Sequence, residues 1–142
     1  RIESFPLEST SFENHSLEDC LTALRTGTSK IQRQAASALA LRDPAQAQQA
    51  CVLLIELLAI PEVRIVALRA LAHLGTGAAP ALPKIRELLD ADDAFIRVGA
   101  TYVLTTIGPD ATELLNRCKD DPDHTVANLA RETLDSWKAS NE

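Results

Sequence analysis

The sequence predicts an all-α protein, an α-solenoid of about four antiparallel helix pairs. The first observation is an internal repeat: four similar segments begin at Ile31, Val63, Ile96 and Val126, at intervals of 32, 33 and 30 residues. The second is a further apolar helical pattern ahead of each segment, whereas no run of residues alternates convincingly as a strand would. Two helices in a repeat of this length indicate stacked units that bury one continuous core.

The repeated segments share a pattern of small and large apolar residues. They read "IQRQAASALALR", "VRIVALRALAHL", "IRVGATYVLTTI" and "VANLARETLDSW". All four have alanine four positions after their first residue and leucine four positions later: Ala35, Ala67, Ala100 and Ala130, then Leu39, Leu71, Leu104 and Leu134. A column of alanine is expected where neighbouring helices cross most closely. Gly75 and Gly108 follow two of the segments, where a left-handed residue is expected to end the helix.

The first helix of each pair is expected just before its repeated segment. Apolar residues at helical spacing place these helices at about 16–26, 44–59, 79–90 and 110–119. Pro44, Pro80 and Pro109 lie near three of the starts, where a missing N–H costs least. The approximate units are 16–42, 44–75, 78–108 and 109–138, within a repeat domain of residues 16–142. Residues 1–15 lack helical periodicity and are expected to form an arm or linker, anchored by Phe5, Leu7 and Phe12.

The composition narrows the classes of partner. A net charge of −6 argues against general attraction to nucleic acid or anionic lipid. No uninterrupted apolar run reaches the roughly 18 residues of a membrane span. Cys20, Cys51 and Cys118 each lie at helical spacing from leucine, so we expect them to be buried and unpaired. The chain contains no Met and begins with Arg1, which favours a fragment of a longer protein.

No residue pattern indicates a reaction centre, a metal site or a cofactor. His15, His73 and His124 are far apart in sequence and lack metal-ligand spacing. Neither a nucleophile motif nor a phosphate-binding glycine loop is present. The turns "DADD" and "DDPD" lack the glycine and distal glutamate of a calcium loop, so we expect them to cap helix N-termini. We therefore predict a non-catalytic domain without a cofactor.

The stretch "PALPKIRELLDADDAFIRVGATYVLTTIG" resembles the short bacterial HEAT-like repeat of the PBS-lyase type. The resemblance covers about 16–138 and implies a right-handed superhelix of helix pairs. It also implies that Arg64 and Arg97, which stand at the family's arginine position, pair with turn acids of the same or the adjacent unit; Asp92 or Asp93 could serve Arg97. The first and last units depart from the pattern, with Gln32 and Ala127 at that position.

In such an array the second helices line the concave surface, so their non-core positions predict a binding face. These positions suggest the protein-binding residues Arg33, Ile65, Leu68, Arg69, Val98, Tyr102 and Arg131. Arginine and tyrosine are enriched at binding hot spots, and exposed Ile, Leu and Val would be costly without a reason. The alternative is that contacts between repeats already bury the apolar members.

The expected function is that of a protein-interaction or scaffold domain, an accessory part of a larger bacterial protein. Its partner would be a protein segment or a neighbouring domain of the parent chain, with no nucleic acid and no membrane, and the chain would be a monomer. The resemblance also implies alternatives: a C-terminal accessory domain of an exported enzyme such as a sulfatase, a bilin lyase, or a DNA glycosylase. Free thiols favour the cytoplasm, whereas fusion to an exported enzyme implies the periplasm.

Overall fold

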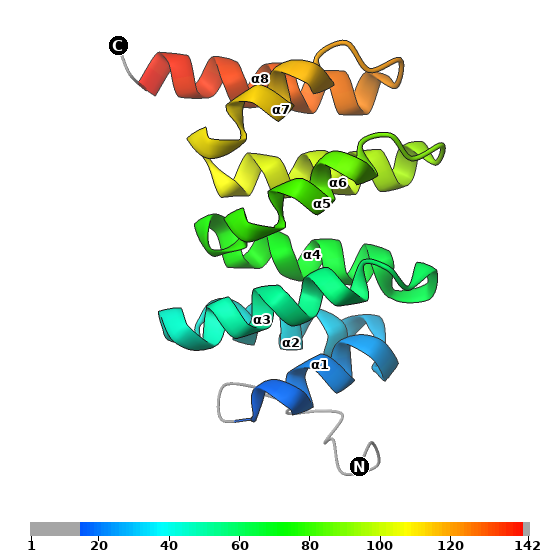
Figure 1. Ribbon diagram of the computed structural model, residues 1–142, viewed down its shortest axis with the longest axis vertical. Helices are drawn as coiled ribbons and strands as arrows, with labels where there is room; N and C mark the ends of the chain where they lie inside the picture. Colours follow the sequence, from blue (N-terminus) through cyan, green and yellow to red (C-terminus); the bar gives the residue numbers. More distant parts are fainter. Residues whose placement is uncertain (1–14, 141–142) are drawn as a thin grey trace.

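The computed structural model describes residues 15–140, and it confirms the all-α prediction (Figure 1). The predicted arm lies almost entirely outside the described residues. In the described range the α-helices are α1 (Leu17–Thr26), α2 (Ser29–Ala40), α3 (Pro44–Leu57), α4 (Arg64–Leu74), α5 (Leu82–Leu88), α6 (Ala94–Ile107), α7 (Thr112–Cys118) and α8 (His124–Ser140). Short 3-10 helices precede three of them: η2 (Pro61–Val63), η3 (Gly75–Ala81) and η4 (Pro109–Ala111).

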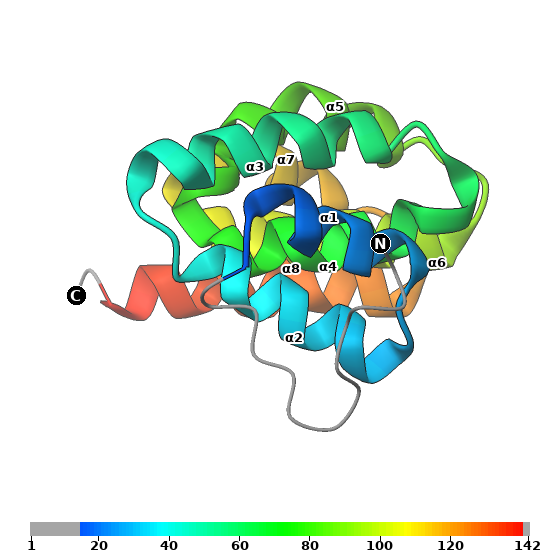
Figure 2. The ribbon, with the colours of Figure 1, turned by 90° about the horizontal axis from the view of Figure 1, so that it is seen from below.

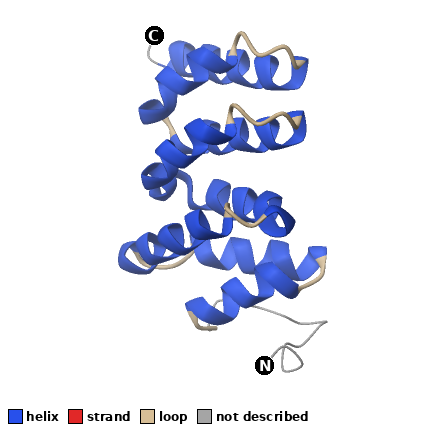
Figure 3. Ribbon diagram, turned by 45° about the vertical axis from the view of Figure 1, so that its right-hand side comes forward, coloured by secondary structure: helices blue, strands red, loops and turns tan. Residues whose placement is uncertain are grey.

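The helices form a stack of antiparallel pairs in two layers. Figure 1 shows the pairs α1/α2, α3/α4, α5/α6 and α7/α8 in succession along the long axis. Figure 2, seen along the stack, shows α3 and α5 on one side and α2, α4 and α8 on the other. Each of the second helices α2, α4 and α6 packs against the next one along the stack. No strand occurs between residues 15 and 140 (Figure 3).

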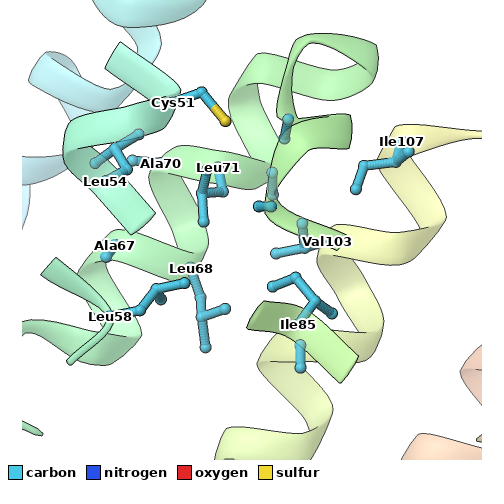
Figure 4. Packing of buried hydrophobic residues seen from close by; sticks show 14 of the residues in the cluster. Cys51, Leu54, Leu58, Ala67, Leu68, Ala70, Leu71, Ile85, Val103 and Ile107 are labelled. Atoms are coloured by element: carbon cyan, nitrogen blue, oxygen red, sulfur yellow. The ribbon is translucent and has the colours of Figure 1, made fainter. Parts of the chain in front are cut away.

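The alanine and leucine columns form the core as predicted. The four column alanines are at most 1% exposed, and Leu39, Leu71 and Leu104 are fully buried. Figure 4 shows Ala70 and Leu71 of α4 close to Leu54 of α3, and Ala67 closer to Leu58. Small side chains let helix axes approach closely, while the leucines fill the space between the layers. Leu134 in the last unit is only partly buried, since no described unit follows it.

Each unit joins its two helices by one further contact. A side chain of the second helix donates a hydrogen bond to a backbone carbonyl at the end of the first, where the helix leaves its last carbonyls without partners. The bonds run from Gln32 to Leu24 O (3.0 Å), Arg64 to Leu58 O (2.7 Å), Arg97 to Ala91 O (2.9 Å) and Arg131 to Lys119 O (3.0 Å). We call this contact the helix-end clip.

The clip confirms a structural role for Arg97 but corrects its predicted partner. Arg97 forms a two-point ion pair with Asp121 of the following unit, Nε to Oδ2 at 3.0 Å and Nη2 to Oδ1 at 3.3 Å. This bond with Asp121 raises the pKa of the Arg97 guanidinium. Asp92 contributes only its carbonyl, and the Asp93 carboxylate accepts from Phe95 N at 2.9 Å. The partner is therefore a turn acid of the adjacent unit, one of the two arrangements that the resemblance implies, and not Asp92 or Asp93 of the same unit.

The acidic turns cap helices, as expected. Asp93 is the N-cap of α6, and Asp123 Oδ1 accepts from the N–H of Thr125 and Val126 at the start of α8. Ser16, Thr28 and Asp43 cap the first three helices in the same way. Carboxylates at these ends also interact favourably with the helix dipole.

The first helices of the third and fourth units are shorter than predicted. The stretch expected as helix from residue 79 begins as the 3-10 helix η3, and α5 starts only at Leu82. Pro80 lies inside η3, and Pro83 instead occupies the first turn of α5. In the fourth unit Pro109 opens η4 and α7 starts at Thr112. A proline pattern marks where a helical path can begin but does not distinguish 3-10 from α geometry.

Gly75 and Gly108 end α4 and α6 with positive φ, as predicted, but not in the left-handed helical region. Their angles are φ 59°, ψ −127° and φ 102°, ψ −156°. This is the mirror image of extended backbone, which is open essentially to glycine alone. The two residues therefore redirect the chain outward into η3 and η4 rather than wrapping the helix end.

One long apolar segment corrects an expectation from the sequence. Pro61–Leu88 contains an 18-residue window with a mean hydropathy of 1.3, so by length and composition alone the segment could cross a membrane. In the fold this segment is divided among η2, α4, η3 and α5, and its direction changes at Gly75. Leu71 and Ile85 from it are fully buried in the core, so packing within the fold accounts for the apolar composition.

Replacing Gly108 by alanine tests the glycine turn. A Cβ at Gly108 would meet no atom within 4 Å, so only the backbone angle opposes it. We expect Gly108→Ala to lower the free energy of unfolding by about 1–2 kcal/mol in urea titrations. Gly77→Ala is the control, since its φ is ordinary and its Cβ would sit 3.8 Å from Leu74. Equal effects of the two substitutions would contradict this account.

Asp121→Asn tests the ion pair between units. Arg97 and Asp121 are 14% and 12% exposed at their side chains, whereas Arg117 and Asp90, paired between α7 and the end of α5, are 43% and 71% exposed. Breaking an ion pair that is shielded from solvent lowers the free energy of unfolding more than breaking a solvated pair. We expect Asp121→Asn to lower the urea midpoint clearly and Asp90→Asn to leave it nearly unchanged. Equal urea midpoints for Asp121→Asn and Asp90→Asn would show that the ion pair between Arg97 and Asp121 does not stabilise the contact between units.

Candidate functional site

A groove runs between α4 and α6 on the outer side of the second-helix layer. It encloses about 340 Å³. Its lining comes from α4 (Ile65, Leu68, Arg69 and His73) and from α6 (Phe95, Val98, Gly99 and Tyr102). We call it the α4–α6 groove. Arg69 and Tyr102 lie on the opposite side of their helices from the alanine and leucine columns, whereas Leu68 lies next to the leucine column and belongs to the core.

The depth of the groove depends on Gly99. The corresponding position in α4 is Val66, which has a branched side chain. A Cβ at Gly99 would lie 3.0 Å from Leu68 Cδ1 and 4.0 Å from Ile65 Cδ1. The absent side chain lets Leu68 lie across the seam, where it is only 2% exposed. Leu68 and Gly99 thus form an apolar floor between Ile65 and Val98, which are partly buried.

Two exposed aromatic side chains border this floor. Phe95 is 64% exposed and Tyr102 is 51% exposed. They are seven residues apart on α6, two helical turns or about 10 Å along one face. Apolar rings left in water at the edge of an apolar floor are typical of a surface that another molecule covers.

The opposite rim is cationic. Arg69 and His73 of α4 line the groove and also a small hollow between α2 and α4, which Arg33 borders from α2. His73 Nδ1 lies 2.9 Å from Arg69 O, and since a carbonyl only accepts, Nδ1 carries the proton. This leaves His73 Nε2 available for other contacts. Within residues 15–140 the guanidinium groups of Arg33 and Arg69 have no hydrogen-bond or ion-pair partner.

A comparison with protein-family models identifies the repeat. The model for HEAT repeats matches residues 52–135, which is more than half of the chain. The chain belongs to the HEAT-repeat family. Comparisons with curated proteins and with solved structures give no match. The matched residues run from α3 into α8 and include the whole α4–α6 groove, and HEAT repeats are typically non-catalytic units that form extended binding surfaces.

Five of the seven predicted binding residues line the same groove of this HEAT array: Ile65, Leu68, Arg69, Val98 and Tyr102. Leu68 was expected on the exposed face and is instead buried, because its column faces the following repeat; Ala36 and Thr101 in that column are buried as well. For Leu68 the alternative, burial between repeats, is therefore the correct one. Ile65 and Val98 remain partly accessible.

Arg33 and Arg131 lie outside the groove. Arg33 borders the neighbouring hollow, one seam away. Arg131 occupies the same column as Leu68, but in the last described unit, and it makes the helix-end clip to Lys119 O. It lines a separate groove of about 570 Å³ between α7 and α8, together with Leu134 and Trp137. Arg131 therefore does not share a surface site with the other six predicted residues, which line the α4–α6 groove or the neighbouring hollow.

Sequence reasoning missed three groove residues: Phe95, His73 and Gly99. Phe95 precedes the first residue of its repeated segment, so the repeat pattern does not include it, although its spacing from Tyr102 places both on one face. His73 lies four residues after Arg69, which is also one helical turn. Gly99 was visible as a departure from the larger residues at that position in other units, Gln34, Val66 and Leu129.

The groove lining has the chemistry of a binding surface. Its lining contains apolar and aromatic side chains, one arginine and one histidine, with no thiol, serine hydroxyl or carboxylate. Among residues 15–140, no cluster of three His, Cys, Asp or Glu side chains could hold a metal ion. The surface can bury apolar groups and donate charged hydrogen bonds, which are the contacts that protein recognition uses.

The three cysteines are buried, as predicted, and none of them forms a disulfide. Burial raises the pKa of the Cys20, Cys51 and Cys118 thiols; for Cys20 this outweighs the opposite effect of its hydrogen bond from Arg42. Because the folded thiols hold their protons to higher pH than the unfolded ones, stability must fall as the pH rises above the unfolded value of about 8.5.

We therefore expect the free energy of unfolding to decrease between pH 8 and 9.5, and thiol reagents to react only after unfolding. Urea titrations at several pH values measure the slope. The control is the triple variant Cys20→Ala, Cys51→Ala, Cys118→Ala, in which the slope should be smaller. An unchanged slope in the triple variant would assign the pH dependence to other groups.

Proposed function

We propose that this HEAT-repeat chain is an interaction domain whose α4–α6 groove binds a segment of a partner protein or of a neighbouring domain of its parent chain. The observation that carries the proposal is the pair of exposed rings, Phe95 and Tyr102, beside an apolar floor and an unpaired Arg69. Tyrosine and arginine at the edge of a desolvated apolar patch are the residues that dominate binding energies at protein interfaces.

The exposed apolar surface is large enough to contribute measurable affinity. An aromatic side chain has about 150–250 Å² of surface. Covering the exposed parts of Phe95 and Tyr102 would remove about 200 Å² from water, which corresponds to about 5 kcal/mol before the cost of association. That cost is several kcal/mol, so contacts from the charged rim and the groove floor are needed for a stable complex.

Fusion as an accessory domain would use the same groove. In that arrangement the occupant belongs to the parent chain, and a high local concentration compensates for modest affinity. Bilin attachment or base excision would need a nucleophile or a general base beside the bound group. The groove lining supplies no carboxylate and no thiol, and its one histidine, His73, has no acidic partner among the lining residues to orient it, so interaction is the function that the groove's chemistry favours.

Photo-crosslinking tests the proposal. A photoreactive phenylalanine analogue at position 95 should form adducts with a discrete protein, whose affinity for the chain can then be measured. We expect Arg69→Glu with Tyr102→Ala to weaken that binding at least about tenfold, because it removes one ring and reverses one charge. The thermal unfolding midpoint should not change, since both side chains are exposed.

The matched control changes the same kinds of residue elsewhere. Arg25→Glu with Val52→Ala alters an exposed, unpaired arginine and an exposed apolar side chain on α1 and α3. Binding by this control should remain within about twofold of the original. Loss of binding in the control, or full binding by the groove variant, would refute the proposed site.

A further inference from the structure

The placement of the unpaired arginines indicates what the groove would bind. Arg33 and Arg69 border one hollow between α2 and α4, and neither guanidinium has a partner in the described residues. Arg64 and Arg97 are engaged in helix-end clips, and Arg117 pairs with Asp90. Arg25 on α1 is also unpaired among residues 15–140, but it lines neither the α4–α6 groove nor the α2–α4 hollow. Two free guanidinium groups that face one hollow form a receptor for a carboxylate, which accepts paired N–H bonds.

The local charge differs from that of the whole chain. The protein has a net charge of −6. No carboxylate lines the α4–α6 groove or the α2–α4 hollow, and their charged or titratable members are Arg33, Arg69 and His73, apart from the phenol of Tyr102. An acidic group is therefore attracted to this part of the second-helix face, although the net charge of the chain is negative.

We infer that the occupant is an extended peptide segment that crosses the second helices, with an apolar side chain in the α4–α6 groove and a carboxylate between Arg33 and Arg69. This inference rests on the proposed function and adds the chemistry of the partner. The apolar side chain contacts Phe95, Tyr102 and the floor at Leu68. The carboxylate side chain lies one seam nearer the N-terminus, over the hollow.

The spacing of the two contacts follows from the spacing of the helices. Successive seams of packed helices are about 8–10 Å apart. A polyproline II segment advances about 3.1 Å per residue with three residues per turn, so side chains three positions apart face the same way about 9 Å apart. The segment therefore has an apolar residue and an Asp or Glu separated by two residues.

Three short capped peptides provide the test. Each has the same flanks and two central prolines, which favour the extended conformation. The sequences at the contact positions are Phe-Pro-Pro-Glu, Phe-Pro-Pro-Lys and Ala-Pro-Pro-Glu. Titrations of the isotope-labelled protein, followed by NMR, report both affinity and location. We expect the first peptide to shift the amide signals of α4 and α6 and the side-chain N–H signals of Arg33 and Arg69.

The first peptide should bind at least about fivefold more tightly than either of the other two. The variant Arg33→Glu with Arg69→Glu should reverse the preference and bind the lysine peptide more tightly. The control Arg25→Glu with Arg86→Glu has the same change in net charge on other elements and should retain the original preference. A reversal in the groove variant alone is a result that general electrostatics would not produce.

The outcomes separate this inference from the proposed function. Equal binding of the glutamate and lysine peptides at α4 and α6 would overturn the carboxylate contact and leave an apolar interaction groove. Shifts confined to other helices, or no shifts with any peptide at millimolar concentration, would overturn the inference altogether. The photo-crosslinking at position 95 reports on the interaction surface independently, because it uses no acidic probe.

Discussion

The close approach of the second helices at the alanine column is the constraint on which the structure depends. Ala35, Ala67, Ala100 and Ala130 are almost completely buried, one in each unit. A single helix pair has too little apolar surface on its own to form a core, so each unit gains stability from its neighbours. Any larger side chain in this column would separate the helix axes and misalign the leucines that fill the space between the layers. The α4–α6 groove forms between two helices held this closely because α6 has glycine, Gly99, where α4 has the branched Val66.

The helix-end clip shows how one geometric requirement is met by different residues. The carbonyl at the end of each first helix needs a donor, and the second helix supplies Gln32, Arg64, Arg97 or Arg131. In the last unit the residue at the position of Gln32, Arg64 and Arg97 is Ala127, which has no donor, and Arg131 donates the bond from one helical turn later. This explains both departures from the arginine pattern. It also separates arginines that hold the fold from Arg33 and Arg69, whose guanidinium groups have no such bond and are available to a partner.

The sequence was sufficient to predict features that depend on periodicity. The repeat interval predicted the helix pairs, and the alanine and leucine columns predicted the core at Ala67 and Leu71. Helical spacing likewise brought Ile65, Arg69, Val98 and Tyr102 to one face. Features that depend on how one unit stacks on the next were not predictable in this way. Leu68 is buried because its column faces the following repeat, where Gly99 leaves room for it, and Arg97 pairs with Asp121 across a unit boundary. The 3-10 helices at the start of the third and fourth units were also not predicted, since proline is compatible with the first turn of either a 3-10 helix or an α-helix.

Gly99 gives the array a simple route to new binding specificity. The corresponding positions in the other units hold Gln34, Val66 and Leu129, so among the described seams only the one between α4 and α6 has a glycine there. A change at this one position of a repeat deepens or fills a slot on the surface without altering repeat length, the alanine column or the helix-end clip. A family that duplicates whole repeats could therefore diversify its ligands one seam at a time, with selection acting on each slot while the scaffold is inherited intact.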